Sequence, residues 1–238
     1  MYKGGIRIVK VKNPQEGFEV CKNLLYENVS KTSVLFLSGG STPKSLYEIL
    51  AKEQRLSIGA VAMVDERYGG KLHNDSNEKM IRATGLISYI ENHVRFYPIL
   101  ENKSSEETAR DYDDTVRYLF GYFRKSIGIL GIGADGHTAG LPAGNKNQQS
   151  IINNQELVTS FDDFPGEFKK RITLTFLGLS KLDLIIVLAF GKEKKKALKL
   201  MFTHSAGSGQ EEIGEIPARF LLEKGIAEKT ILITDQLI

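Results

Sequence analysis

The stretch VLFLSGGSTPKSLYEIL, residues 34–50, decides the fold of this chain. Its four opening apolar residues are typical of a strand buried on both faces. Gly39 and Gly40 then permit a tight turn. Pro43 suits the first position of a helix with Thr42 as its N-cap. The apolar residues that follow recur at helical spacing, so the stretch predicts a strand, a glycine-rich loop and a helix.

The same alternation continues along the chain. Other short apolar runs predict buried strands at Val61–Val64, Ile127–Leu130, Leu184–Phe190 and Thr230–Ile233. Segments 16–29 and 105–125 repeat apolar side chains every three or four residues, which predicts amphipathic helices. Ser104 and Glu107 supply a capping box for the second helix, and Cys21 lies on the apolar stripe of the first as a core residue. Strands alternating with helices predict an α/β fold, with a mainly parallel sheet covered by helices on both faces.

Composition narrows the class of protein. The 238 residues include 32 Lys and Arg, 29 Asp and Glu and one cysteine, with a net charge of +3. No Pro- or Ser-rich linker divides the chain, so residues 1–238 are expected to form a single α/β domain. The small charge excess argues against nucleic acid as a partner. The longest apolar run, 184–190, is far shorter than the ~20 residues that span a bilayer. The N-terminus lacks the apolar stretch of a signal peptide, and we expect a cytoplasmic protein without a membrane partner.

Three loops follow predicted strands, where ligands bind in open α/β sheets. The first holds Gly39, Gly40, Ser41 and Thr42. Exposed backbone N–H groups at the start of a helix attract anions, so this loop is a candidate phosphate site. The alternative is a plain glycine-rich turn with a capped helix.

The second loop begins with Asp65, Glu66 and Arg67 and is followed by the polar stretch 73–77. The guanidinium of Arg67 could make a bidentate contact to phosphate or carboxylate. The alternative is a local ion-pair network, with residues 73–77 as a solvated loop that contributes only to the rim.

The third loop places Asp135 two residues before His137, with Gly133 among its turn-forming glycines. Imidazole can act as a base near neutral pH. A carboxylate bonded to one ring nitrogen would fix the tautomer and leave the other nitrogen to take a proton from water. The alternative is a loop histidine with a purely structural role.

Two cations further along fit an anionic ligand. Arg171 immediately precedes the alternating segment 172–175, and Lys192 is expected to begin a helix over 192–202. A cation at a helix N-terminus opposes the helix dipole, and a bound anion would relieve that cost. The alternative is a solvated lysine face.

Taken in order, these motifs resemble those of the 6-phosphogluconolactonase family. They are Ser38–Pro43, Asp65–Arg67, His73–Asn77, Gly133–Ala139, Arg171–Thr175 and Gly191-Lys192 with Ala197. The wider superfamily also holds glucosamine-6-phosphate deaminases and isomerases. The resemblance implies a Rossmann-like fold that binds a sugar phosphate rather than a nucleotide. It also implies hydrolysis of 6-phosphoglucono-δ-lactone to 6-phosphogluconate in the oxidative pentose phosphate pathway, without metal or cofactor, by a monomer or homodimer.

The resemblance further implies a role for each residue. His137 would deprotonate water, Asp135 would orient it, and Arg67 or loop N–H groups would stabilise the oxyanion. The phosphate would be held by Ser41, Thr42, Arg171 and Lys192. The remaining substrate contacts would come from Gly39, Gly40, Asp65 and Gly133.

Two departures keep other readings open. Deaminases typically carry a glutamate five residues after the loop histidine, where this chain has Pro142. The segment Gly140–Gly144 differs from the family's usual Ser-Leu-Phe-Pro-Gly, so it leaves the exact sugar phosphate, and any role as a lid, open. The first alternative is a deaminase or isomerase with Asp65 as the base. The second is a sugar-phosphate sensor without catalysis.

Overall fold

The computed structural model describes residues 1–144, 155–165, 167–203 and 213–237. Within them, one large sheet has the strand order β1-β2-β11-β10-β7-β3-β4-β6. The strands are β1 (Tyr2–Lys3), β2 (Ile6–Lys10), β3 (Ser33–Leu37), β4 (Ala60–Met63), β6 (Arg95–Tyr97), β7 (Lys125–Gly131), β10 (Leu184–Ala189) and β11 (Thr230–Thr234). Only β1 pairs antiparallel among these, so the sheet is mainly parallel, as the sequence predicted.

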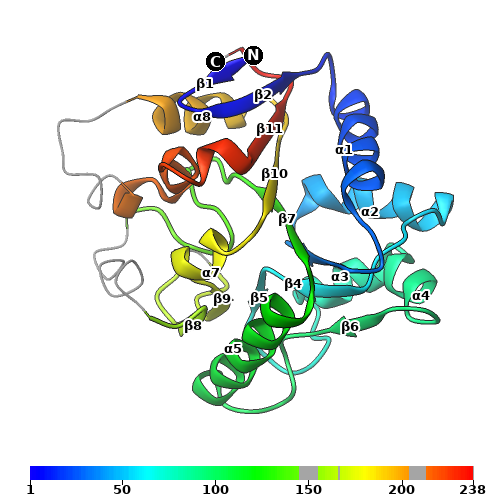
Figure 1. Ribbon diagram of the computed structural model, residues 1–238. Helices are drawn as coiled ribbons and strands as arrows, with labels where there is room; N and C mark the ends of the chain where they lie inside the picture. The colour runs from blue at the N-terminus through cyan, green and yellow to red at the C-terminus, as the bar shows by residue number, and fades with distance from the viewer. Residues whose placement is uncertain (145–154, 166, 204–212, 238) are drawn as a thin grey trace.

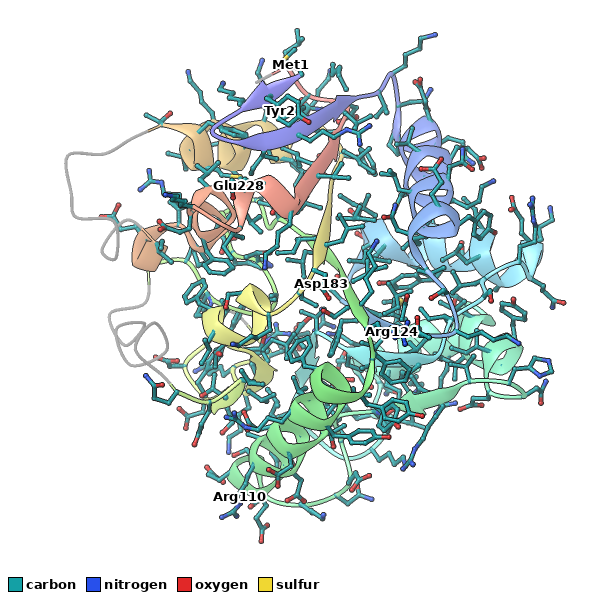
Figure 2. The ribbon with its side chains drawn as sticks, in the orientation of Figure 1. Met1, Tyr2, Arg110, Arg124, Asp183 and Glu228 are labelled. Carbon is teal, nitrogen blue, oxygen red and sulfur yellow. The ribbon has the colours of Figure 1, made fainter. Side chains whose placement is uncertain are left out.

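Helices cover both faces of this sheet. They are α1 (Pro14–Asn28), α2 (Ser41–Glu53), α3 (Asn77–Ala83), α4 (Leu86–Ile90), α5 (Ser105–Tyr122), α7 (Phe176–Ser180) and α8 (Lys194–Phe202), with 3-10 turns η1 (Pro217–Leu222) and η2 (Ala227–Lys229). In Figure 1, α1 and α2 lie on one side of the central strands, and α7 and α8 lie on the other. Buried apolar side chains fill the space between sheet and helices (Figure 2).

The strongest sequence patterns are confirmed. All five predicted strands are present, as β3, β4, β7, β10 and β11, and Cys21 is buried in the core on α1. The capping box of Ser104 and Glu107 is present at the start of α5. That helix ends at Tyr122, earlier than predicted, because Lys125 already belongs to β7.

Two predicted helix starts are wrong. Gly40, not Thr42, is the N-cap of α2, so Pro43 is the third helical residue. Proline is still tolerated there, because the first turn of a helix has no partner for its N–H groups. The helix expected to begin at Lys192 begins two residues later, at Lys194, with Glu193 as its N-cap.

A second, smaller sheet has the order β5-β9-β8 and is antiparallel. Its strands are β5 (Asp65–Arg67), β8 (Val158–Phe161) and β9 (Arg171–Leu174). The sequence suggested a loop at Asp65–Arg67, and pairing with β9 makes it a strand. The hydroxyl of Thr173 on β9 donates to the carbonyl oxygen of Ala139, in the loop after β7. The small sheet is therefore fastened to the carboxyl end of the large one.

Candidate active site

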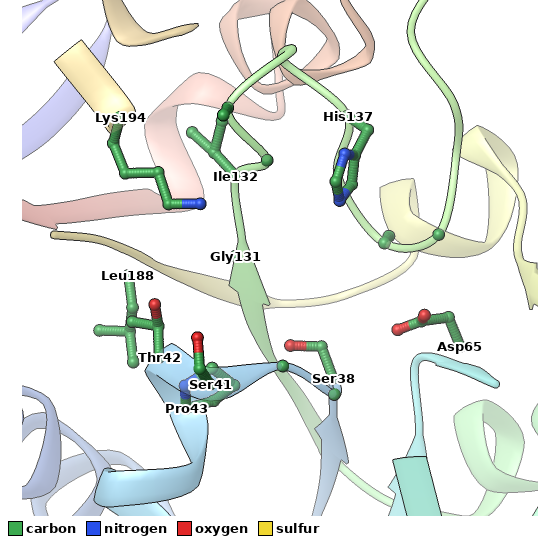
Figure 3. A pocket seen from close by; sticks show the side chains of 16 residues that line it. Ser38, Ser41, Thr42, Pro43, Asp65, Gly131, Ile132, His137, Leu188 and Lys194 are labelled. Atoms are coloured by element: carbon green, nitrogen blue, oxygen red, sulfur yellow. The ribbon is translucent and has the colours of Figure 1, made fainter. Parts of the chain in front are cut away.

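A cavity of about 220 Å³ opens at the carboxyl ends of β3 and β7. Figure 3 shows the sixteen residues that line it. They are Ser38, Gly39, Gly40, Ser41, Thr42, Pro43, Asp65, Gly131, Ile132, Gly133, Ala134, His137, Ala139, Gly140, Leu188 and Lys194. The parallel sheet thus brings the first and third predicted loops together, with Asp65 from the second.

One end of the cavity is formed by the start of α2. Gly40 has φ 106°, and no side chain caps the helix, so the first-turn N–H groups have no capping partner. Gly39 passes so close to Asn77 that an added Cβ would lie 2.0 Å from its Oδ1. The hydroxyl of Ser38 is buried without a hydrogen-bond partner in the structure. Unpaired donors at a helix N-terminus are suited to an anion, and we call this region the anion end.

A lysine completes the anion end. Lys194, the first residue of α8, lines the cavity, and in Figure 3 its side chain extends toward Ser41 and Thr42. Lys192, which the sequence favoured, is exposed and is not among the lining residues. The sequence signal, a run of lysines at a helix start, was present for both. The point at which α8 begins distinguishes them, because Lys192 precedes the helix and Lys194 is its first residue.

His137 and Asp135 form a hydrogen-bonded pair on the opposite side of the cavity, which we call the histidine end. The ring Nδ1 lies 2.6 Å from Asp135 Oδ1, which also accepts the His137 N–H at 3.1 Å. The hydrogen bond with His137 lowers the pKa of Asp135 to about 2. The imidazole is directed into the cavity in Figure 3, with its side chain 38% exposed. A carboxylate on Nδ1 leaves Nε2 available for proton transfer.

The glycines of this loop make the pair possible. Gly133 donates to the carbonyl oxygen of His137 at 2.8 Å, and Gly136 adopts φ 93°. A Cβ on Gly133 would lie 2.0 Å from His137 Nδ1. The turn therefore excludes a side chain at Gly133, which supports it as part of the site wall rather than as a ligand contact.

Asp65 forms the floor of the histidine end. Its carboxylate is buried and accepts a hydrogen bond from Asn77 Nδ2 at 3.2 Å. Burial raises the pKa of Asp65, while Arg171, His137 and Arg67 oppose that rise. Asn77 thus places the polar stretch 73–77 behind the site instead of leaving it as a free loop.

Glu66 does not line the cavity, and its carboxylate anchors α3. Its carboxylate accepts the backbone N–H groups of Asn77 at 2.6 Å and Glu78 at 2.8 Å, and the Ser76 hydroxyl at 3.0 Å. Burial raises the pKa of Glu66 to about 7, against these hydrogen bonds. The two acidic residues therefore have different roles. Asp65 lines the cavity, and Glu66 fixes the start of α3.

Arg67 and Arg171 lie on β5 and β9, directly opposite each other. Neither is among the residues that line the cavity. Arg171 packs on Phe164, whose ring edge also contacts the His137 ring with centroids 5.6 Å apart. Arg171 therefore packs near His137 through Phe164, whereas the resemblance grouped it with Ser41 and Thr42 as a phosphate ligand.

The segment Gly140–Gly144 connects the loop after β7 to its neighbours on two sides, the small sheet and the stretch before η1. Leu141 is buried and its N–H donates to Thr138 at 2.8 Å, while Gly144 donates to Glu215 at 3.1 Å. Gly140 has φ 69° and would place a Cβ 3.0 Å from that of Asp65. This glycine allows the close approach of the loop after β7 to the small sheet.

The described residues offer neither a metal site nor a membrane-spanning helix. Across residues 1–144, 155–165, 167–203 and 213–237, no three His, Cys, Asp or Glu side chains gather in a way that could hold a metal ion. In the same part of the chain, no helix has the length and apolar character needed to cross a membrane.

Comparisons with known proteins agree with this geometry. Residues 18–231 match the family model described as glucosamine-6-phosphate isomerases/6-phosphogluconolactonase. A 6-phosphogluconolactonase of Xylella fastidiosa is 31% identical over 189 residues, covering 75% of this chain and 76% of that protein. A glucosamine-6-phosphate deaminase of Streptococcus uberis is 29% identical over 214 residues, covering 83% and 87%. The solved 6-phosphogluconolactonase of Plasmodium vivax superimposes with a TM-score of 0.79 at 20% identity, covering 100% of this chain and 93% of that one, which shows the shared fold.

The fold and the cavity define a Rossmann-like α/β protein with an anion end and a histidine end. The chain belongs to the glucosamine-6-phosphate isomerase/6-phosphogluconolactonase family.

Proposed function

We propose that this protein hydrolyses 6-phosphoglucono-δ-lactone to 6-phosphogluconate. The observation that carries the proposal is the hydrogen-bonded pair of His137 and Asp135, which faces a cavity whose other end is suited to a phosphate. One small molecule with a phosphate at one end and an electrophilic carbon at the other fits both ends at once. Relatives named 6-phosphogluconolactonase support the same reaction.

The phosphate would be held at the anion end. The first-turn N–H groups of α2, the hydroxyls of Ser41 and Thr42, and the Lys194 ammonium supply donors and positive charge there. Binding energy gained at this end, remote from the reacting carbon, positions the lactone for attack. We propose Lys194 for the role that the resemblance suggested for Lys192.

Catalysis would take place at the histidine end. His137 accepts a proton from water at Nε2 while the water oxygen attacks the lactone carbonyl carbon. Asp135 holds the imidazole and stabilises its protonated form. When the tetrahedral intermediate collapses, the bond from C1 to the ring oxygen breaks, and His137 returns the proton to that oxygen. The products are a free hydroxyl and a carboxylic acid at C1, which loses its proton to water at neutral pH to give the carboxylate.

A second candidate is deamination or isomerisation of glucosamine 6-phosphate. Asp65 favours it, because this buried carboxylate lines the cavity and could remove a proton from carbon. A relative named as a deaminase also aligns with most of the chain. Pro142, where deaminases typically carry a glutamate, cannot supply a second carboxylate to His137. The lactonase reaction is therefore the better supported.

A paired assay tests the choice. The protein should accelerate the opening of freshly generated 6-phosphoglucono-δ-lactone beyond its spontaneous rate. It should release no ammonia from glucosamine 6-phosphate under the same conditions. Ammonia release without lactone hydrolysis would contradict the proposal, and binding of sugar phosphates without any turnover would support a sensor.

We also propose that the enzyme acts in the cytoplasm as a monomer or homodimer. The single cysteine, Cys21, is buried, which suits a reducing compartment. A sugar phosphate is the partner that the family and the cavity support.

A further inference from the structure

Arg67 and Arg171 form a pair of like charges, and neither makes an ion pair within the described part of the chain. They lie opposite each other in the antiparallel pairing of β5 and β9, an arrangement that is destabilising by itself. In the part of the chain that the structure describes, the arginines in ion pairs are others: Arg82, Arg117 and Arg219. The Nε atoms of Arg67 and Arg171 are buried without a hydrogen-bond partner. Such a pair is stable when an anion lies between or beside the two charges.

Burial makes the cost greater at Arg171. This residue is 9% exposed, and loss of solvent lowers the pKa of its guanidinium. An unpaired buried charge strongly destabilises a fold. In a site that stabilises an anion during turnover, the positively charged side chain is already in position before the substrate binds.

Aromatic rings fix the direction of both guanidinium groups. Arg171 lies 4.3 Å from the centroid of Phe164, and Arg67 lies 4.7 Å from that of Phe168. Arg67 also donates to the carbonyl oxygen of Asp75 at 3.1 Å. A guanidinium stacked on a ring keeps its N–H groups in the plane of the fork, where they can meet a carboxylate.

The location of the pair points to the reacting carbon. Phe164 contacts both Arg171 and the ring of His137. The Asp65 carboxylate, which is held by Asn77, interacts electrostatically with Arg171, Arg67 and His137. Asp65 and Glu66 both act electrostatically on Arg171, but among the described residues neither lies within ion-pair distance of it. The Arg171 guanidinium can therefore still pair with an incoming anion. Lys194 and the start of α2 lie across the cavity from Asp65 and His137 (Figure 3).

We infer that Arg171, assisted by Arg67, binds the C1 end of the substrate and not its phosphate. It stabilises the negative charge that develops on the lactone carbonyl oxygen and then holds the C1 carboxylate of the product. This inference rests on the proposed lactonase function and assigns the oxyanion role within it. It also predicts a preference for ligands that carry negative charge on an oxygen at C1, as the tetrahedral intermediate and the product do.

Two ligands that differ only at C1 test the inference. 6-Phosphogluconate carries the phosphate and the C1 carboxylate, and glucitol 6-phosphate carries the same phosphate with a C1 alcohol. Their dissociation constants are measured by calorimetry for the wild type and for Arg171→Gln. We expect the constant for 6-phosphogluconate to rise about 10- to 100-fold, because a hydrogen bond to a charged group is lost. The constant for glucitol 6-phosphate should change by less than about threefold.

Two further variants complete the experiment. Lys194→Gln should weaken both ligands to the same degree, because both carry the phosphate. Arg171→Lys keeps the charge and the aliphatic stem but loses the planar fork, so it should restore part of the preference for the carboxylate even if Arg171→Gln folds poorly.

The possible contrary results separate a failure of the Arg171 assignment from a failure of the proposed function. Equal weakening of both ligands in Arg171→Gln, or no weakening of either, would overturn the assignment of Arg171 while leaving lactone hydrolysis by the wild type intact. A wild type that binds neither ligand and hydrolyses no lactone would overturn the proposed function and this inference together.

Discussion

The two ends of the cavity are built in different ways. The anion end comes from one continuous stretch, Ser38–Pro43, plus Lys194, and it presents mostly backbone N–H groups. The histidine end combines side chains from the loop after β7 and from β5, and Arg171 of β9 packs beside it through Phe164. These three segments lie far apart in the sequence. The anion end is therefore encoded mainly by one local stretch of sequence, whereas the histidine end depends on how distant segments pack. Changes at the two ends should therefore alter different kinetic constants.

The largest effect is expected from His137→Ala. General-base catalysis typically contributes about 10²–10⁴-fold, and kcat for the lactone should fall by that factor. The affinity for glucitol 6-phosphate should stay within a few-fold, because the anion end is intact. Steady-state kinetics and calorimetry check this, with His93→Ala, which removes an exposed imidazole outside the cavity, as the control. Equal loss of turnover and affinity would indicate a structural histidine.

Lys194→Gln should have the opposite signature. A charge-assisted hydrogen bond contributes about 1.5–3 kcal/mol, which corresponds to about a 10- to 100-fold rise in KM. The kcat value should change much less. Lys196→Gln removes an exposed charge from the same helix and serves as the matched control. A larger effect of Lys192→Gln than of Lys194→Gln would return the phosphate role to Lys192.

Asp135→Asn should reduce kcat by about tenfold, because an amide can still hydrogen-bond to the ring but cannot stabilise its protonated form. The effect stays moderate since the pair is partly exposed to solvent, which weakens its electrostatic interaction. Rates measured from pH 5 to 8 check this. The hydrogen bond that lowers the pKa of Asp135 to about 2 keeps the wild-type carboxylate ionised throughout that range. An unchanged kcat would place the orienting role elsewhere.

The smallest effect concerns the scaffold beneath the histidine end. Because the pKa of Glu66 is raised to about 7 in the fold, the native protein binds more protons than the unfolded chain between about pH 4.5 and 7. The contribution of Glu66 to the free energy of unfolding therefore falls as pH rises through this window.

Comparison with Glu66→Gln isolates that contribution. As pH rises from 5 to 7.5, the wild type should lose stability relative to the variant in urea unfolding, because other titrating groups are common to both. A stability difference that stays constant, or that moves in favour of the wild type, would contradict the raised pKa.

Five strands of the large sheet, β3, β4, β7, β10 and β11, could be predicted from sequence because each contains an apolar run, whereas the shorter or more polar β1, β2 and β6 were not predicted. Burial on both faces leaves β10 no polar residue and β3 only its first, Ser33, so their apolar pattern is clear. The residues of β5 are Asp65, Glu66 and Arg67, which carry no strand signal of their own. Their extended conformation comes from pairing with β9, about a hundred residues later, and no local pattern records that pairing.

In the candidate site too, some features follow from a local sequence pattern and others depend on distant contacts. The spacing of Asp135 and His137 within a glycine-rich turn predicted a hydrogen-bonded pair, and the pair is present. The anion loop followed from a strand, two glycines and a helix. The choice between Lys192 and Lys194 depends on where α8 begins, and the position of Arg171 depends on the second sheet. Both are properties of tertiary packing, which a local pattern does not contain.

The structure of this protein with 6-phosphogluconate bound tests most directly how the substrate lies between the anion end and the histidine end. We predict that the phosphate lies at the first turn of α2 within hydrogen-bond distance of Lys194, and that the C1 carboxylate contacts His137 and Arg171. A product bound in the reverse direction, with its phosphate on Arg171, or with C1 beyond contact with the His137 ring, would contradict it.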